Sequence, residues 1–327
     1  MKKKVYIFSI FVISMISSSC ETEIDLGDIA IKPHLVLNAS LSNADTSRIY
    51  ISESRPIFHF SNTSQWGEGN FLSIDNADVD LLINNNNKTK ERLQYSIKDS
   101  SYLYLKPLKA SDQLSIEVQY KDKKINAQTS IPNAPEILSV DTFSFSKGNS
   151  YGQDYLRFHV KIKDQAVTKN FYRITVDFAQ HRQSFWPGDG GYWTRSSQFI
   201  SDDPVLTNGS PNSNNQGDDD FGMIIFPTNY FGIFHDAAFN GEEYLLDFYV
   251  SYPLFISQMD YYDKGHLRVN LQTISEDLYK YYFSLQRYMH SLNDGFIEPA
   301  IVFSNINKGL GILGAYNEVS VIKLEEK

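Results

Sequence analysis

Apolar and polar residues alternate along much of the chain from residue 33 onward. The clearest example is Gln113–Tyr120, where Leu114, Ile116 and Val118 alternate with polar neighbours. A period of two is typical of a strand with one buried and one exposed face. Further strands of this kind are predicted at 34–41, 47–54, 77–84, 88–96 and 125–131. About seven short strands in roughly 100 residues predict an immunoglobulin-like or fibronectin-like β-sandwich over residues 33–132.

A second β-rich domain is predicted over residues 136–327. The segment Ile131–Ile137 carries two prolines, which cannot continue a central strand and therefore mark a boundary. Strand patterns resume beyond it at 154–164, 170–178, 242–252, 266–274, 300–306 and 316–324. Gly309, Gly311 and Gly314 lie between the last two patterns, and we expect them to form a turn. The fold class that follows is mainly β, with two β-sandwich domains.

One α-helix is predicted, over residues 274–291, and we expect it to pack on the second sandwich. Thr273 and Glu276 have the spacing of a capping box, which predicts Thr273 as the N-cap. Apolar residues recur at helical spacing from Leu278 to Met289. Their simplest role is packing onto the second sheet.

Residues 184–220 are predicted to be long loops that do not fit a plain sandwich. Trp186, Tyr192 and Trp193 stand among turn residues here, and Thr207–Asp220 is polar and low in complexity. Aromatic side chains offer a large contact area at little cost in rotamer entropy, so these three are candidate ligand-binding residues for a sugar, a peptide aromatic side chain or a siderophore-like ring. The alternative is that the loop uses its own aromatic residues to hold itself in place.

The first 32 residues predict export and lipidation. Lys2–Lys4 precede an apolar stretch, Val5–Ile16, which is too short to span a bilayer, and small residues lead to Cys20. We therefore predict a signal peptide over 1–19. Cys20, the single cysteine, occupies the position of a bacterial lipobox, whose thiol receives a diacylglycerol with palmitate-type acyl chains. Residues 20–32 then form a lipidated acidic tether.

The net charge and the search for sequence motifs reduce the number of function classes to consider. Removing Lys2, Lys3 and Lys4 with the signal peptide changes the net charge from −9 to −12, which argues against a nucleic-acid partner. The sequence has no P-loop, dinucleotide fingerprint, nucleophile elbow or zinc-binding helix. We expect no catalytic residues, no metal and no cofactor, and hence no enzyme.

Several segments taken together resemble one family. They are "CETEIDL", "PHLVLNASLSN", "YLYLKPLKASDQLSIEV", "TSIPNAPEI", "FISDDPVL", "FHDAAFNGEEYLL" and "SNINKGLGILGAY", in that order. They resemble the Bacteroidota outer-membrane lipoproteins grouped as domain of unknown function 4249. Within them, Asp202–Pro204 and Phe234–Gly241 flank the polar loop, where bracing is their simplest role.

The resemblance implies an outer-membrane lipoprotein that faces the cell exterior and assists a TonB-dependent receptor in nutrient uptake. It supplies no catalytic residues. The acidic residues after Cys20 resemble an export signal for the outer surface, with a periplasm-facing anchor as the alternative. The alternative function is a structural or adhesive envelope protein with no small-molecule ligand.

Lipidation of Cys20 is directly testable. Mass spectrometry of the native protein should show a mature chain that begins at Cys20 and carries acyl chains, because two or three chains are needed for stable anchoring. The Cys20→Ser variant should lose this mass and leave the membrane fraction, whereas Ser19→Ala should retain both. An unmodified thiol in a soluble wild-type protein would contradict the prediction.

Overall fold

Strands make up most of the computed structural model. It describes residues 33–54, 73–84, 89–146, 154–166, 168–180, 192–195, 199–201, 203–207, 229–251, 266–292 and 300–324. All of these except Pro33 belong to one compact unit, His34–Lys327. The strands are β1 (Leu35–Ser42), β2 (Ser47–Glu53), β3 (Asp78–Asn84), β4 (Thr89–Arg92), β5 (Gln94–Ser96), β6 (Ser101–Tyr104), β7 (Gln113–Tyr120), β8 (Lys123–Ser130), β9 (Glu136–Ser146), β10 (Asp154–Lys163), β11 (Phe171–Gln180), β12 (Tyr192–Arg195), β13 (Phe199–Ile200), β14 (Ile233–His235), β15 (Glu243–Ser251), β16 (His266–Ile274) and β17 (Leu310–Leu324). A 3₁₀ turn spans Asp236–Ala238, and the α-helix α3 spans Glu276–Leu292. The predicted mainly β class is confirmed.

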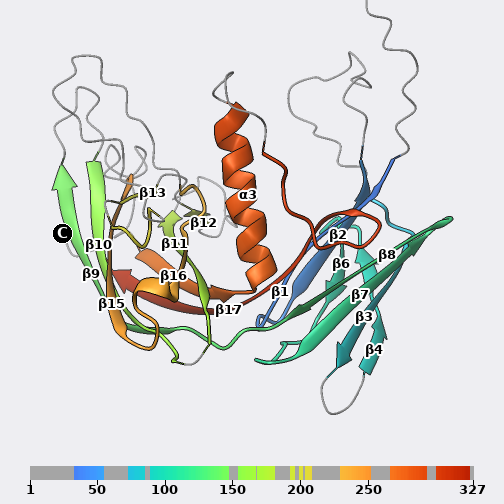
Figure 1. Ribbon diagram of the computed structural model, residues 1–327, viewed down its shortest axis with the longest axis horizontal. Coiled ribbons are helices and arrows are strands. Elements are labelled where there is room, and N and C mark those ends of the chain that lie inside the picture. The colour runs from blue at the N-terminus through green and yellow to red at the C-terminus, as the bar shows by residue number, and fades with distance from the viewer. Residues whose placement is uncertain are drawn as a thin grey trace, which may run out of the picture. The chain divides into compact units, whose positions relative to one another are not determined.

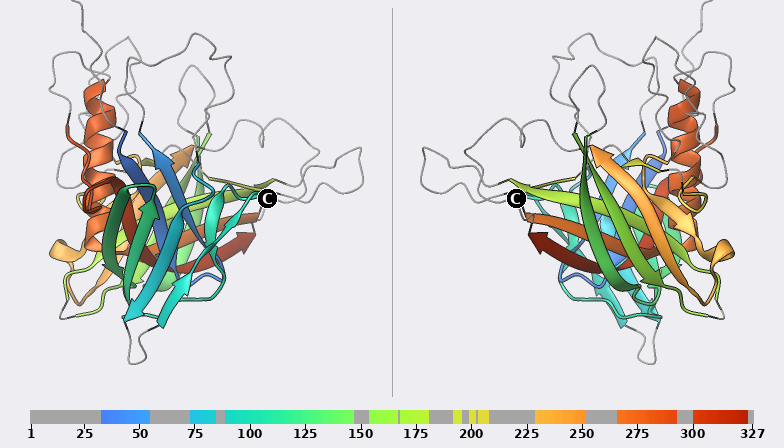
Figure 2. Two further views of the ribbon diagram at one scale, coloured as in Figure 1. Left: turned by 90° about the vertical axis from the view of Figure 1, so that its right-hand side faces the viewer. Right: turned by 90° about the vertical axis from the view of Figure 1, so that its left-hand side faces the viewer.

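The first sandwich packs the sheet β4-β3-β7-β8 against β1, β2, β6 and β5 (Figure 2, left). Its core follows from the alternation in the sequence: Leu37 and Ile49 from one sheet meet Leu81, Ile116 and Val118 from the other, all fully buried. Strand β7 spans the same residues as the clearest predicted strand.

The second sandwich packs the sheet β13-β15-β10-β9 (Figure 2, right) against β11 and β16. Phe158 of β10 stacks on Phe248 of β15 with ring centroids 5.2 Å apart. Ile174 and Val269 cover them from the opposite sheet. The stretch 131–135 between β8 and β9 connects the two sandwiches and contains no strand.

Strand β17 belongs to both sandwiches. Its first half pairs with β1 in parallel, from Val36↔Leu310 to Ser42↔Tyr316. Its second half pairs with β16 antiparallel, from Ile274↔Tyr316 to His266↔Leu324. The result is one nine-stranded sheet, in the order β12-β11-β16-β17-β1-β2-β6-β5 with β14 added to β11. We call it the shared sheet, because one of its faces contributes to both hydrophobic cores. Figure 1 shows β17 running from one sandwich into the other.

Two of the glycines that were expected to form a turn lie inside β17. Gly311 has φ +99°, and a Cβ atom there would stand 2.2 Å from the carbonyl oxygen of Leu37. At Gly314 a Cβ atom would stand 2.7 Å from Leu278 Cδ1 of the helix. The prediction of a turn at these two positions is wrong: they allow close approach by β1 on one side and by α3 on the other. The predicted strand at 300–306 is also wrong, since these residues form no strand.

Helix α3 packs on the outer face of the shared sheet, the face opposite the two cores (Figure 1). Leu278 lies in a cluster with Phe171, Ile274 and Ile312. The helix begins at Glu276, two residues later than predicted, because Ile274 and Thr273 continue β16. Thr273 is therefore not the N-cap. Ser275 takes that place, since its Oγ accepts the backbone N–H of Leu278 at 3.4 Å.

Gly311→Ala should destabilise the protein. A residue with a side chain at positive φ costs about 1–3 kcal/mol, and the contact with Leu37 adds to that cost. Urea unfolding of the full chain measures the loss. Ile322→Ala, an exposed change in the same strand, is the control and should stay within about 0.5 kcal/mol of wild type. Equal stability of Gly311→Ala and wild type would show that β1 and β17 do not approach so closely.

Candidate functional site

Two of the three candidate aromatic residues lie in an edge strand of the shared sheet. Trp193 and Tyr192 of β12 stand opposite Ala179 and Gln180 of β11. Residues 184–220 are thus not loop throughout, because they contain β12 and β13. Trp186 and Cys20 lie outside the described residues, so their proposed roles stay predictions.

The last residue of β12 ties this strand to the sheet through a buried carboxylate. Asp177 of β11 has only 4% of its side chain exposed. Arg195 Nε donates to its Oδ1 at 2.9 Å, and Arg268 Nη2 donates to its Oδ2 at 2.9 Å. Asn270 Nδ2 donates to the same Oδ2, also at 2.9 Å. We call these four residues the Asp177 cluster.

Burial and hydrogen bonding shift the pKa of Asp177 in opposite directions. Burial is the largest single effect and raises its pKa, but the hydrogen bonds from Arg195, Arg268 and Asn270, together with the charge of Arg195, lower it by more, so its pKa lies below the ordinary value. For Arg195, burial is the largest single effect and lowers the pKa, but the hydrogen bond and the charge of Asp177, together with the charge of Glu318, raise it above its ordinary value. The pair is therefore fully ionised at neutral pH, as an ion pair with good geometry should be.

The cluster is one end of a polar surface on the outer face of the shared sheet. Register places four rows side by side across β11, β16 and β17. From one end of the strands to the other, the rows are Asp177–Arg268–Ile322, Thr175–Asn270–Ser320, Arg173–Gln272–Glu318 and Phe171–Ile274–Tyr316. The rows change from charged to apolar toward α3, because the last row lies in the hydrophobic cluster under the helix.

Hydrogen bonds also run within the polar rows. Asn270 Nδ2 also donates to Thr175 Oγ1 at 3.2 Å, and Ser320 Oγ donates to Asn270 Oδ1 at 2.7 Å. Gln272 Nε2 donates to Glu318 Oε2 at 2.6 Å. Buried polar groups are costly unless they are bonded, and these hydrogen bonds satisfy the buried amides of Asn270 and Gln272.

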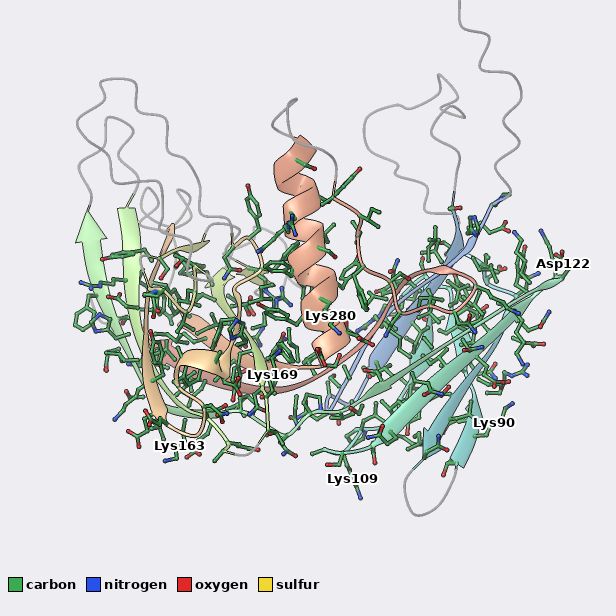
Figure 3. All side chains as sticks on the ribbon, in the orientation of Figure 1. Lys90, Lys109, Asp122, Lys163, Lys169 and Lys280 are labelled. Atoms are coloured by element: carbon green, nitrogen blue, oxygen red, sulfur yellow. The ribbon has the colours of Figure 1, made fainter. Side chains whose placement is uncertain are left out.

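Aromatic residues of α3 pack against the apolar row, next to the polar surface. Figure 3 draws the described side chains on the ribbon, with Lys280 of this helix labelled. The Arg173 guanidinium lies 4.9 Å from the Tyr282 ring centroid, within cation–π range. Phe231 contacts the same ring, with centroids 5.0 Å apart. Nearby, burial raises the pKa of Tyr279 and of Tyr281, so both stay protonated.

The two blocks that flank the polar loop act as braces where they are described. Asp203 is buried, and its Oδ1 accepts bonds from Val205 N at 2.9 Å and from the Tyr244 hydroxyl at 2.7 Å. Asp236, also buried, accepts the Asn170 N–H at 2.6 Å. Asp202 lies outside the described residues. The hydrogen bonds that these two carboxylates accept hold the neighbouring chain segments in place, which is a structural role.

Chemically, the polar surface is suited to binding. In the part of the chain that the structure describes, no three His, Cys, Asp or Glu side chains come close enough to hold a metal ion. Nor does any described helix have the length and apolar character needed to cross a bilayer. Asp177, Asn270 and Gln272 of the polar surface are buried, whereas the arginine side chains are partly exposed, so the guanidinium groups are the donors that a ligand can reach.

Sequence reasoning missed the Asp177 cluster. The signal was present: in Phe171–Phe178 the residues at even numbers are apolar or aromatic, and those between them include Arg173, Thr175 and Asp177. The strand at 266–274 has Arg268, Asn270 and Gln272 in the same phase. What the sequence lacked was the information that β11 and β16 are neighbours.

The protein is thus a mainly β chain of two sandwiches that share one sheet. The outer face of that sheet carries the polar surface. The chain belongs to the family Domain of unknown function (DUF4249), whose model matches residues 21–322. The resemblance inferred from the quoted segments is thereby confirmed. A search of curated proteins found no match.

One similar solved structure is the crystal structure titled "Putative membrane anchored protein" from Corynebacterium diphtheriae. It shares 8% identity with this chain at a TM-score of 0.20, and the match covers 74% of this chain. The chain spans about half of that protein, 54% of its length. So low a TM-score supports no conclusion about fold or function.

Asp177→Asn should destabilise the protein by about 3–5 kcal/mol at pH 7, because it leaves two arginines beside a partner without charge. The pKa of Asp177 is lowered in the folded state, so its contribution is present above the unfolded value, about 3.9, and is lost as pH falls through the lower folded value. Urea unfolding at pH 7 and below pH 3 should therefore show a difference from wild type that shrinks in acid.

The control is Asp141→Asn, which removes an exposed carboxylate 3.7 Å from Lys323 and should have no measurable effect. If Asp177→Asn were as stable as wild type at pH 7, the cluster would not hold β12 to the sheet.

Proposed function

We propose that this chain is an outer-membrane lipoprotein, anchored through Cys20 and facing the cell exterior. In this proposal it is a non-catalytic accessory component of a TonB-dependent nutrient uptake system. Its ligand is either the receptor or the cargo that the receptor transports.

The observation that carries the proposal is the position of Cys20. It follows a short apolar stretch that ends in small residues, as acylation requires, and the folded unit begins at His34. Residues 21–33 span at most roughly 45 Å when fully extended. A unit on so short a tether stays within reach of proteins embedded in the same membrane.

The sheet architecture supports a binding role. Function is often carried by exposed elements that a rigid scaffold positions. Here β12, with Tyr192 and Trp193, is paired to β11 and held by the Asp177 cluster. The scaffold is rigid because both sandwiches pack against the same sheet.

A pull-down from detergent-solubilised outer membranes tests the proposal. Tagged wild-type protein should recover a TonB-dependent receptor at close to one copy per copy. Trp193→Ala should recover much less, because an aromatic anchor is lost from the contact. Phe143→Ala, which removes an exposed aromatic residue from β9, should recover as much as wild type.

Recovery of no such receptor by wild type would overturn the proposal. The adhesive alternative predicts a different pattern: the double variant Trp186→Ala, Trp193→Ala would grow normally on every nutrient and attach differently to surfaces.

A further inference from the structure

We infer that the Asp177 cluster is the charged part of a binding site for an oxyanion, in which Arg195 contacts the ligand and Asp177 positions Arg195. The oxyanion is a carboxylate or a phosphate carried by a ring-bearing molecule. This inference rests on the proposed binding function and names the ligand chemistry of that site.

Arg195 is held in place yet accessible. Its Nε is the atom that donates to Asp177, and 47% of its side chain is exposed. Within the described part of the chain, its Nη1 and Nη2 make no hydrogen bond. A guanidinium presents such donors in a planar fork that matches a carboxylate or a phosphate. A side chain fixed at Nε loses less conformational entropy when a ligand arrives.

The count of charges within the cluster favours an anion. Asp177 accepts hydrogen bonds from three donors, and two of them are arginines, so within these four residues the positive charges outnumber the negative ones by one. When Arg173 and Glu318 are included, the charged side chains of the polar surface sum to +1. The net charge of the whole chain is −9. Glu318 lies near enough to contribute to the raised pKa of Arg195, and its carboxylate would accept a hydroxyl group of the same ligand.

Stability alone does not account for the cluster. Two arginines around one buried carboxylate incur a desolvation cost, and well-packed apolar residues commonly stabilise a fold as much or more. A binding role explains why charges are kept on the outer face, where α3 covers the apolar row and leaves Arg195 accessible.

The neighbouring residues indicate the rest of the ligand. Trp193 and Arg195 belong to the same four-residue strand, whose position on β11 is fixed by the Asp177↔Arg195 register. The two residues are two positions apart in the strand and so belong to the same face of it, and an aromatic residue and an arginine on one face together suit a ring that bears an acidic group. A sugar acid or a sugar phosphate has this combination of ring, hydroxyls and oxyanion.

Isothermal titration of the full chain with three matched probes tests the inference. Glucuronate carries a carboxylate, glucose 6-phosphate carries a phosphate, and glucose carries neither. At least one anionic probe should bind wild type roughly tenfold or more tightly than glucose, because hydrogen bonds to charged groups are the stronger ones. Which anion binds distinguishes the two oxyanions.

Two arginine variants locate the site. Arg195→Gln should lose the preference for the anionic probe, and Arg195→Lys should keep part of it. The matched control is Arg48→Gln: Arg48 is also 47% exposed and paired with an aspartate, Asp99, but it lies on the first sandwich. That variant should bind like wild type.

Asp177→Asn separates positioning from contact. It should weaken anion binding and also speed amide hydrogen exchange in residues 192–195, whereas Arg195→Lys should leave this exchange closer to wild type. Circular dichroism and thermal unfolding confirm that each variant is folded.

The inference is overturned if no anionic probe binds wild type more tightly than glucose, or if Arg195→Gln binds the anion as well as wild type. Both outcomes are separate from the receptor pull-down. A chain that recovers the receptor without binding anions refutes the oxyanion site alone, and one that binds anions without recovering a receptor refutes only the proposed partner.

Discussion

The backbone contact between β1 and β17 is the constraint on which the rest of the structure depends. Gly311 brings β17 so close to the Leu37 carbonyl that a side chain would not fit. This parallel pairing joins the beginning of the folded unit to its end. Because β17 then continues into an antiparallel pairing with β16, one strand closes the first sandwich and extends into the second. Leu313 and Ala315 lie in the first core, and Val321 packs against the second.

This arrangement determines where a binding surface can form. One face of the shared sheet is used by both hydrophobic cores, so chemistry on that sheet is confined to the outer face. Helix α3 covers the apolar end of that face, and Gly314 allows Leu278 to approach it. The polar rows remain beside the helix, with the Asp177 cluster at their far end. The candidate site thus follows from which part of the sheet the helix leaves uncovered.

Much of the local structure could be predicted from the sequence, and the long-range pairing could not. Strand β7 was found by alternation because one of its faces is buried and the other is not. The pairing of β1 with β17 leaves no local signal, since the partners are far apart in the chain; Gly311 and Gly314 were therefore interpreted as a turn. Thr273 had the spacing of an N-cap, but pairing with β11 and β17 extends β16 past it and leaves the cap to Ser275. Arg195 and Asp177 became a site only once β12 and β11 were seen to be neighbours.

The most direct test of the shared sheet compares two fragments. Residues 34–132 contain the first sandwich without β17, and a second fragment carries 304–324 appended through a flexible linker. The account predicts that the shorter fragment lacks a cooperative unfolding transition, because its core lacks Leu313 and Ala315, and that the appended strand restores the transition. A cooperative transition of equal midpoint in both fragments would contradict it.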